Sequence, residues 1–276
     1  MMFGDNLGIF RAVDIDKNTT ADEFKTVLMG CLSQEEHDCF TIDKLHLAPY
    51  PIDDCGTQVA VFKFSPPIPS FLKKVAAGEK KHLRDRKGNL IEIDANFWGL
   101  TQLNHPKEDI LLDYNFGDAK PGKSIVAISG LANHAYGAWS GVESNGTVQM
   151  WLQDFLPEEP DLGSRCRIMI YGYSTQADDL VTYVAGFLEE LFKARRKPLN
   201  FTRENYPIES HGIVVDKNSA VLGLPDDLEE DYDVDGDHIS LIQFTGQAGR
   251  TYTTIIGLLQ RLLARLRNKV SARTSS

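Results

Sequence analysis

Apolar and polar residues alternate over short stretches in the first hundred positions of the chain. Four stretches combine β-branched and aromatic residues in the manner of strands: IFRAVDI at 9–15, FTIDKLHLAP at 40–49, TQVAVFKF at 57–64 and NLIEIDA at 89–95. Apolar residues recur at helical spacing in SFLKKVAAG (70–78) and in TADEFKTVLMGCL (20–32), where Thr20 and Glu23 match a capping box. The order βαββαβ predicts a small ferredoxin-like α+β module over residues 1–100.

The same order of elements describes an RNA-recognition motif, in which aromatic residues of the third strand stack on bases. When Phe64 is aligned with the last of those aromatics, the stacking positions fall on Val59 and Val61, which offer no π-face. The chain also has a net charge of -10 and a pI near 5.2, which disfavours contact with a phosphate backbone. We therefore expect a packing or partner-binding module and no nucleic-acid partner.

Residues 79–89 (EKKHLRDRKGN) mix both signs of charge and predict a solvated loop, and residues 101–123 predict a linker that ends in a polar stretch with proline and glycine. Beyond the linker, almost wholly apolar runs at 124–129 (SIVAIS), 165–173 (RCRIMIYGY) and 211–215 (HGIVV) predict buried strands. These runs alternate with helical patterns at 150–157, 178–196 and 253–270. The pattern predicts a parallel sheet covered by helices on both faces over residues 124–270, followed by a tail at 271–276.

Composition and short motifs narrow the kinds of site. The four cysteines show no C-x-x-C spacing, the N-terminus lacks a signal-peptide pattern, and no apolar run reaches the length of a membrane span. We therefore expect a cytoplasmic protein without an integral membrane segment. The run DYDVDGDHISLI (231–242) imitates a calcium loop but ends in Ile242, where a bidentate glutamate is required. Nucleotide-binding glycine motifs and metal-ligand spacings are missing too, so the sequence predicts no cofactor and no metal.

Several phrases of the second half occur in a fixed order: SIVAISGLANHAYGAW, MWLQDFLPEE, RIMIYGYST, IVVDKNSAVLG and DGDHISLIQF. Together they resemble the α/β-hydrolase domain of fungal lipase/esterase-like proteins. These serine-esterase modules are often fused ahead of NACHT or repeat domains in fungal immune-type receptors, and are related to the serine active-site-containing proteins of animals. The segment that ends in FWGLTQL is similar to the leader ahead of this domain. The resemblance implies an α/β fold with a truncated α/β-hydrolase-like sheet, and, as an alternative to the cytoplasm, peripheral association with the mitochondrial or endoplasmic reticulum membrane.

In that family a serine on a G-x-S-x-G elbow attacks an ester, a histidine takes its proton, and a carboxylate orients the histidine. The resemblance places His238 at the base position. Asn218 stands at the acid position, and Asp216, two residues earlier, is a candidate substitute acid. Leu131 and Ala132 stand in the loop whose N–H groups stabilise the oxyanion.

The elbow itself is missing, because no G-x-S-x-G motif occurs anywhere in the chain. The phrase RRKPL (195–199), which leads into the elbow strand in the family, continues here as NFTRENYPIES (200–210). The family pattern resumes only near the end of the domain, so a central block is missing. We therefore expect a non-catalytic remnant of a serine esterase that serves as an interaction module in fungal self/non-self signalling, with an unidentified protein partner.

Two alternatives keep an active serine hydrolase that cleaves carboxylic esters. In the first, the nucleophile is relocated to Ser129, Ser140 or Ser174, each near a predicted strand end. In the second, the intact protein has the elbow, and a deletion in the assigned reading frame has removed it. The missing strand also has a structural consequence: we expect the strand at 211–215 to pair with those at 124–129 or 165–173 in a sheet of about four to five strands.

Overall fold

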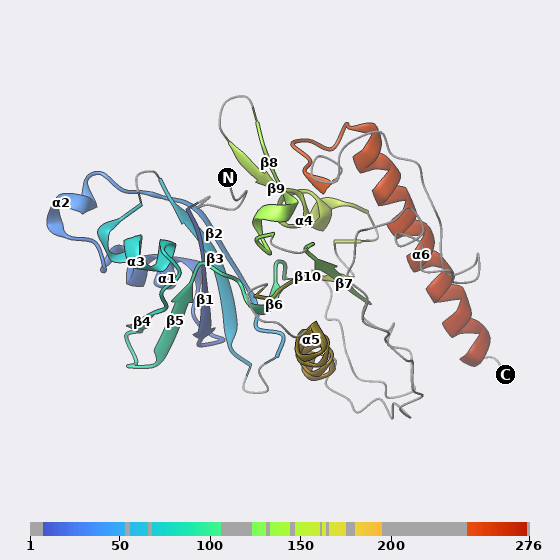
Figure 1. Ribbon diagram of the computed structural model, residues 1–276, viewed down its shortest axis with the longest axis horizontal. Helices are drawn as coiled ribbons and strands as arrows, with labels where there is room; N and C mark the ends of the chain where they lie inside the picture. The colour runs from blue at the N-terminus through green and yellow to red at the C-terminus, as the bar shows by residue number, and fades with distance from the viewer. Residues whose placement is uncertain are drawn as a thin grey trace.

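A computed structural model describes residues 8–52, 56–65, 68–105, 123–130, 133–143, 147–160, 162–163, 166–174, 180–194 and 242–274. Figure 1 shows a blue and teal sheet with short helices beside a second, green and yellow-green sheet, with a long red helix at the C-terminus. No helix among the described residues is long and apolar enough to cross a membrane.

The first half forms an antiparallel five-stranded sheet with the strand order β2-β3-β1-β5-β4. The strands predicted in this half are confirmed, and so is the capping box, in which Glu23 N–H donates to Thr20 Oγ1 (3.3 Å) and Thr20 N–H to Glu23 Oε2 (2.8 Å). The predicted second helix is present as two shorter pieces. The elements are β1 (Ile9–Ile15), α1 (Ala21–Met29), α2 (Gln34–His37), β2 (Ile42–Pro49), β3 (Gln58–Phe64), η1 (Ser70–Leu72), α3 (Lys73–Ala76), β4 (Lys81–Arg84) and β5 (Leu90–Asp94).

Strand β4 lies inside the stretch that was predicted to be a solvated loop, so that prediction is wrong for residues 81–84. Lys81 and Leu83 are half-buried, whereas His82 and Arg84 are exposed, and the strand pairs antiparallel with β5. Because β4 is an edge strand, it tolerates charged side chains that discourage further strand pairing. The charged residues therefore led to the prediction of a loop where the structure has a strand.

One face of this sheet packs under α1 and α3, and the other is covered by the second half of the chain. Phe10, Phe24 and Phe62 belong to the core on the helix side. Val59 and Val61, on the opposite face, are each only 1% exposed, and Val61 shares a core cluster with residues of the second half. The face that would stack bases in an RNA-recognition motif is therefore an internal packing surface.

The second half forms a three-stranded sheet in the order β6-β10-β7. Central β10 (Cys166–Gly172) is buried along its whole length, runs parallel to β7 (Lys123–Ile128) and runs antiparallel to β6 (Gly99–Gln102). Strand β6 extends across the boundary expected at residue 100, so the first residues assigned to the linker belong to this sheet. Residues 106–122 of that linker and the strand predicted at 211–215 lie outside the described residues.

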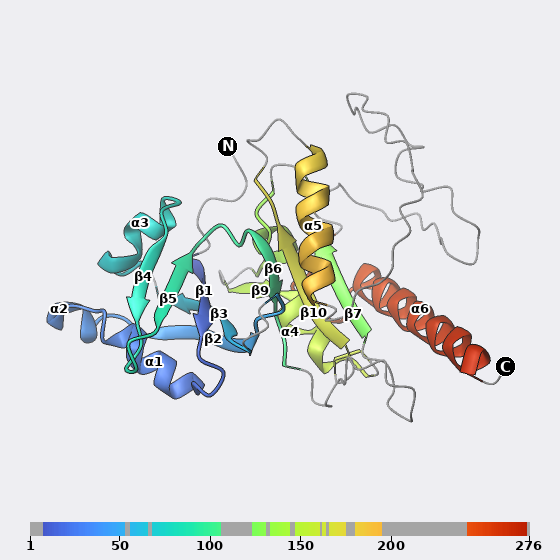
Figure 2. The same cartoon turned by 90° about the horizontal axis from the view of Figure 1, so that it is seen from below.

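Helices pack on both faces of this sheet, and Figure 2 shows α5 in front of β10. On one face lies α5 (Leu180–Ala194), where Phe187 packs edge-on against Tyr171 at 4.8 Å. On the other, Tyr252 and Ile256 of α6 (Arg250–Thr274) share a core cluster with Ile168 of β10. The remaining elements are η2 (Gly137–Trp139), the hairpin β8 (Ser140–Val142) and β9 (Val148–Met150), α4 (Trp151–Asp154) and η3 (Leu156–Glu158).

The run at 124–129 is less buried than its apolar sequence predicts. Residues 124–127 are half-buried and Ile128 is 46% exposed. The reason is that β7 pairs only with β10 among the described strands, so its other edge has no described strand beside it. An apolar run predicts burial on both faces of a sheet, but it says nothing about how many neighbours a strand has.

A buried ion pair joins the two sheets. Arg11 of β1 donates two hydrogen bonds to Asp94 Oδ2, from Nε at 2.9 Å and from Nη2 at 2.7 Å, and both side chains are almost fully buried. The Nη1 group of Arg11 reaches the second sheet, where it donates to the Trp98 carbonyl (2.8 Å) and to Thr101 Oγ1 (2.9 Å). The guanidinium of this β1 residue therefore binds groups of β5 and β6 at once.

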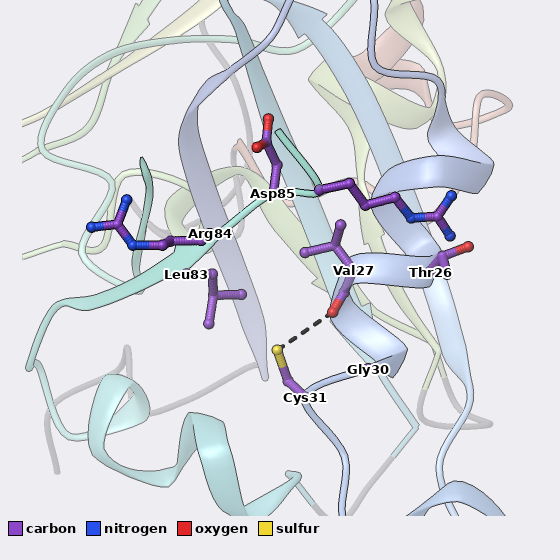
Figure 3. Close-up of a pocket in the computed structure, with 8 residues that line it drawn as sticks. Thr26, Val27, Gly30, Cys31, Leu83, Arg84 and Asp85 are labelled. Atoms are coloured by element: carbon purple, nitrogen blue, oxygen red, sulfur yellow. Dashed lines mark hydrogen bonds between the residues drawn. The ribbon is translucent and has the colours of Figure 1, made fainter. Parts of the chain in front are cut away.

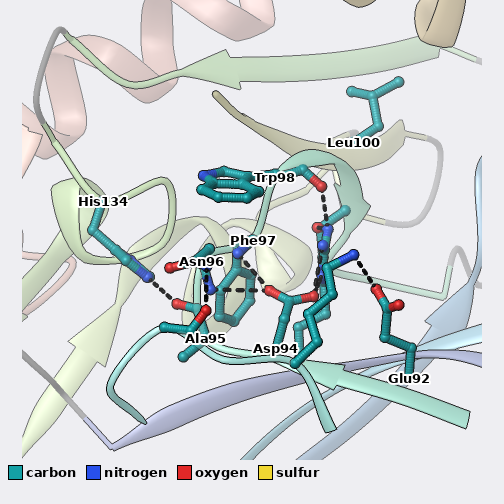
Figure 4. Close-up of polar contacts among 12 residues, drawn as sticks. Glu92, Asp94, Ala95, Asn96, Phe97, Trp98, Leu100 and His134 are labelled. Atoms are coloured by element: carbon teal, nitrogen blue, oxygen red, sulfur yellow. Dashed lines mark hydrogen bonds and ion pairs between the residues drawn. The ribbon is translucent and has the colours of Figure 1, made fainter. Parts of the chain in front are cut away.

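The same carboxylate shapes the turn between the sheets. Asp94 Oδ1 accepts hydrogen bonds from the N–H groups of Asn96 (3.0 Å) and Phe97 (2.8 Å), as Figure 4 shows. Phe97 has a φ of 56°, which is uncommon for a residue with a side chain, and Gly99 follows with a φ of 83°. Asp94 thus holds the chain where it leaves one sheet and enters the other.

Candidate functional site

The carboxyl ends of β7 and β10 are the place where an open parallel sheet offers a site. Ser129 follows β7 directly, and Tyr173 follows Gly172 at the end of β10. Two large side chains flank this edge in exposed positions, Trp98 at 50% and Ile128 at 46%. Trp98 forms an isolated parallel bridge with Gly172, and Ile128 pairs with Tyr171, so both lie next to the end of β10.

Ser129 is buried, and its hydroxyl is engaged by the loop that it begins. Its Oγ donates to the Asn133 carbonyl at 3.4 Å, and its own carbonyl accepts a hydrogen bond from Tyr173 Oη at 3.0 Å. Asn133 N–H in turn donates to the Gly130 carbonyl at 3.2 Å. Burial raises the pKa of Tyr173, so its hydroxyl remains a donor at neutral pH. These contacts close the loop on itself, and among the residues that the structure describes no base is hydrogen-bonded to the Ser129 hydroxyl.

His134, in the same loop, binds three backbone groups with its two ring nitrogens. Nδ1 accepts from the N–H groups of Tyr136 (3.2 Å) and Gly137 (3.0 Å), and Nε2 lies 2.6 Å from the Ala95 carbonyl. Because a carbonyl can only accept, Nε2 carries the proton and the ring is neutral. Burial lowers the pKa of His134, while the Ala95 hydrogen bond and Asp94 oppose that shift. The imidazole has no free nitrogen for a serine hydroxyl.

Ser140 and Ser174 differ in their surroundings. Ser140 is 4% exposed in β8, and its Oγ donates to the Tyr136 carbonyl at 3.1 Å. Ser174 is half-buried and follows Tyr173 beyond the end of β10, which is the position nearest to a conventional site. Three serines were candidates for a relocated nucleophile. The hydroxyls of two of them, Ser129 and Ser140, donate to backbone carbonyls.

The site residues transferred from the family resemblance lie outside the part of the chain that the structure describes. This holds for the base position His238, the acid positions Asn218 and Asp216, and the oxyanion-loop residues Leu131 and Ala132. Their roles stay predictions. Ser129, Gly130, Asn133 and His134, which flank the oxyanion-loop pair, do lie at the carboxyl end of β7.

A second polar cluster lies between β2 and α4, and it was not predicted. Lys44 Nζ lies 2.5 Å from Asp154 Oδ1 and 5.8 Å from the centre of the Tyr136 ring, while Tyr136 Oη donates to Gln153 Oε1 at 2.7 Å. Burial lowers the pKa of Lys44 and that of His46, which lies on the same face of β2. The only signal in the sequence was three charged or polar residues inside a strand pattern. Such residues are as compatible with exposure to solvent as with burial in an interface.

A shallow cavity of about 370 Å³ lies on the described surface, away from the carboxyl ends of β7 and β10. It lies between the end of α1 and β4 and contains the Cys31 thiol, which donates to the Val27 carbonyl at 3.4 Å (Figure 3). Burial raises the pKa of Cys31, so the thiol stays protonated and is a poor nucleophile. Within the described ranges, no three His, Cys, Asp or Glu side chains are grouped to hold a metal ion.

Comparison with protein-family models, with curated proteins and with solved structures finds no match to this chain. A functional assignment therefore depends on the residues and their geometry.

Proposed function

We propose that this chain is a non-catalytic relative of serine-esterase α/β-hydrolase domains, and that it functions by binding a protein partner. The observation that supports this proposal most is that the candidate catalytic groups at the carboxyl end of β7 are hydrogen-bonded to the backbone. The Ser129 hydroxyl donates to a backbone carbonyl, and both nitrogens of His134 are bound to backbone groups. A serine becomes nucleophilic when a neighbouring base accepts its proton, and neither residue offers that arrangement.

The hydrolase-like part of the proposal is supported by the order of elements. Strand β7 leads into the loop at 129–134, and the chain then passes through α4 and returns as β10, parallel to β7. Helices α5 and α6 lie on opposite faces, which is the layering of an α/β fold. The missing G-x-S-x-G motif supports loss of catalysis within such a fold.

A partner-binding role is supported by the exposed pair at the strand ends. Trp98 and Ile128 flank the end of β10, and tryptophan is among the residues that contribute most to protein interfaces. A photo-crosslinking residue at position 98, compared with one at exposed Lys73, tests this role in cells. A protein adduct specific to position 98 supports the proposal. Equal labelling at both positions contradicts it.

Hydrolysis of a p-nitrophenyl ester series tests the loss of catalysis. The wild-type chain and a His238→Ala variant are compared, because His238 stands at the base position of the resemblance. The proposal expects no turnover above the uncatalysed rate in either protein. Turnover that disappears in the His238→Ala variant would show that the chain is an esterase, and Ser129→Ala, Ser140→Ala and Ser174→Ala variants would then identify the nucleophile.

A further inference from the structure

The loop that follows β7 depends on a neutral histidine. His134 is partly buried, and its ring packs edge-on against Phe97 at 5.4 Å. Through Nε2 it reaches the Ala95 carbonyl, in the turn that joins the two sheets, and through Nδ1 it accepts from Tyr136 and Gly137 in its own loop. Figure 4 shows the ring directed at Ala95, beside the turn formed by Asp94 to Trp98. One imidazole therefore ties the loop to the junction of the sheets.

Protonation is incompatible with these contacts. An imidazolium carries a hydrogen on both nitrogens and has no acceptor. A proton on Nδ1 would face the N–H groups of Tyr136 and Gly137, which both need an acceptor, and a buried donor without a partner is unfavourable. The ring would have to leave its position for the cation to be solvated.

The surrounding charges offer the cation little compensation. Asp94 of β5 favours protonation, but its carboxylate is already bound by Arg11 of β1, and that guanidinium opposes protonation. The Ala95 carbonyl favours the cation too, but it binds only Nε2–H and leaves a proton on Nδ1 without an acceptor. Phe97 contacts the imidazole with an uncharged ring. Tyr136 is titratable, but it is neutral because burial raises its pKa.

We propose that His134 makes the loop at 133–139 a pH-sensitive element, which is docked on the turn at 95–97 when the ring is neutral and released when the ring is protonated. Release frees the segment that packs against the end of β10, where a methyl added at Gly172 would lie 2.9 Å from Ala135 Cβ. The edge flanked by Trp98 and Ile128 would thus change shape on acidification. This holds whether the chain is catalytic or not.

Amide hydrogen exchange on the isotopically labelled full chain tests the proposal. Protection factors for Tyr136 and Gly137 are measured from about pH 7.5 to about pH 5, which spans the ordinary imidazole titration. We expect both to fall by roughly tenfold or more, while protection of Phe24 in α1 is unchanged. In a His134→Gln variant, which keeps a donor and an acceptor but does not titrate, protection should not depend on pH. A His37→Gln variant, changed on an exposed helix, should behave as wild type.

The proposal fails if wild-type protection of the two amides stays constant through the titration of His134, or if it falls equally in the His134→Gln variant. Should that variant not fold, ring nitrogen shifts of the wild type still decide. One protonated Nε2 and one unprotonated Nδ1 at about pH 7.5 support the proposal. Two nitrogens with equivalent shifts overturn it.

Discussion

Replacing Asp94 with asparagine tests whether the two sheets form one cooperative unit. The Asp94 and Arg11 side chains are 2% and 6% exposed, so the small values measured for surface ion pairs do not apply. Asparagine retains an oxygen that can accept from Phe97 N–H, so the turn keeps a hydrogen bond. Arg11 instead keeps a buried charge without its counter-ion. Removing one partner of a buried pair costs about 3–5 kcal/mol, and we expect the free energy of unfolding to fall by that amount.

Urea unfolding and thermal unfolding, each followed by tryptophan fluorescence and by circular dichroism, measure this change. All three tryptophans lie at positions 98, 139 and 151, so fluorescence reports on the second half while Arg11 and Asp94 lie in the first sheet. We expect both signals to shift together, with a loss of roughly 6–20 °C in Tm, taking 2–4 °C per kcal/mol for a chain near this size. A coincident shift means that the sheets unfold as one unit.

The Lys80→Gln variant is the matched control. It removes the Lys80–Glu92 ion pair, which is equally short at 2.6 Å but half-exposed, and should cost less than about 1 kcal/mol. The double variant Arg11→Met with Asp94→Asn should recover part of the loss, because no charge is left unpaired and the asparagine oxygen can still accept from Phe97 N–H. The reasoning is refuted if Asp94→Asn costs no more than Lys80→Gln, or if fluorescence does not respond to it.

Three further predictions follow from single contacts. Gly172→Ala should lower the free energy of unfolding, measured in urea, by about 1–3 kcal/mol, because its Cβ would lie 2.1 Å from the Phe97 carbonyl oxygen. The control Gly246→Ala has open space around the new Cβ and should be neutral. Equal effects of the two variants would contradict the packing at Gly172. Because burial lowers the pKa of His46, the unfolded state binds the extra proton, so the stability contributed by neutral His46 is full above about pH 6.5 and is lost as pH falls below it. His46→Gln should therefore flatten the fall in urea midpoint between about pH 7 and pH 5, and an unchanged slope would exclude His46 as its source. Thr20→Ala should lower stability by about 1 kcal/mol through loss of the α1 cap, and no change in the urea midpoint would show that the cap is dispensable.

The strands and the first helix could be predicted because each depends on a local pattern. The Thr20 capping box lies within four residues, and the apolar alternation of β1, β3 and β5 repeats every two residues. Strand β4 was missed because its residues are charged and its place at the sheet edge depends on β5. The burial of Arg11 in β1 could not be predicted, since only the arrival of β6 shows that this face of the sheet is internal.

The site was harder to predict because its contacts join residues that are far apart in the sequence. The role of His134 depends on the Ala95 carbonyl, 39 residues earlier, and a backbone carbonyl has no signature in the sequence. Ser129 and Ser140 were candidates because of their nearness to strand ends, and it takes coordinates to show that their hydroxyls already have backbone acceptors. Sequence patterns located the edge of the sheet but could not show which groups there are occupied.

Labelling with a fluorophosphonate probe tests most directly whether the chain lacks a serine nucleophile. The full-length protein is incubated with the probe beside a known serine esterase, and intact mass followed by peptide mapping finds any adduct. A phosphonylated serine requires an activated hydroxyl. We predict no adduct on the folded chain, with Ser129 and Ser140 unmodified because their hydroxyls are held by carbonyls. A stoichiometric adduct on one serine, Ser174 above all, that is lost on denaturation would contradict the account and make the protein an enzyme.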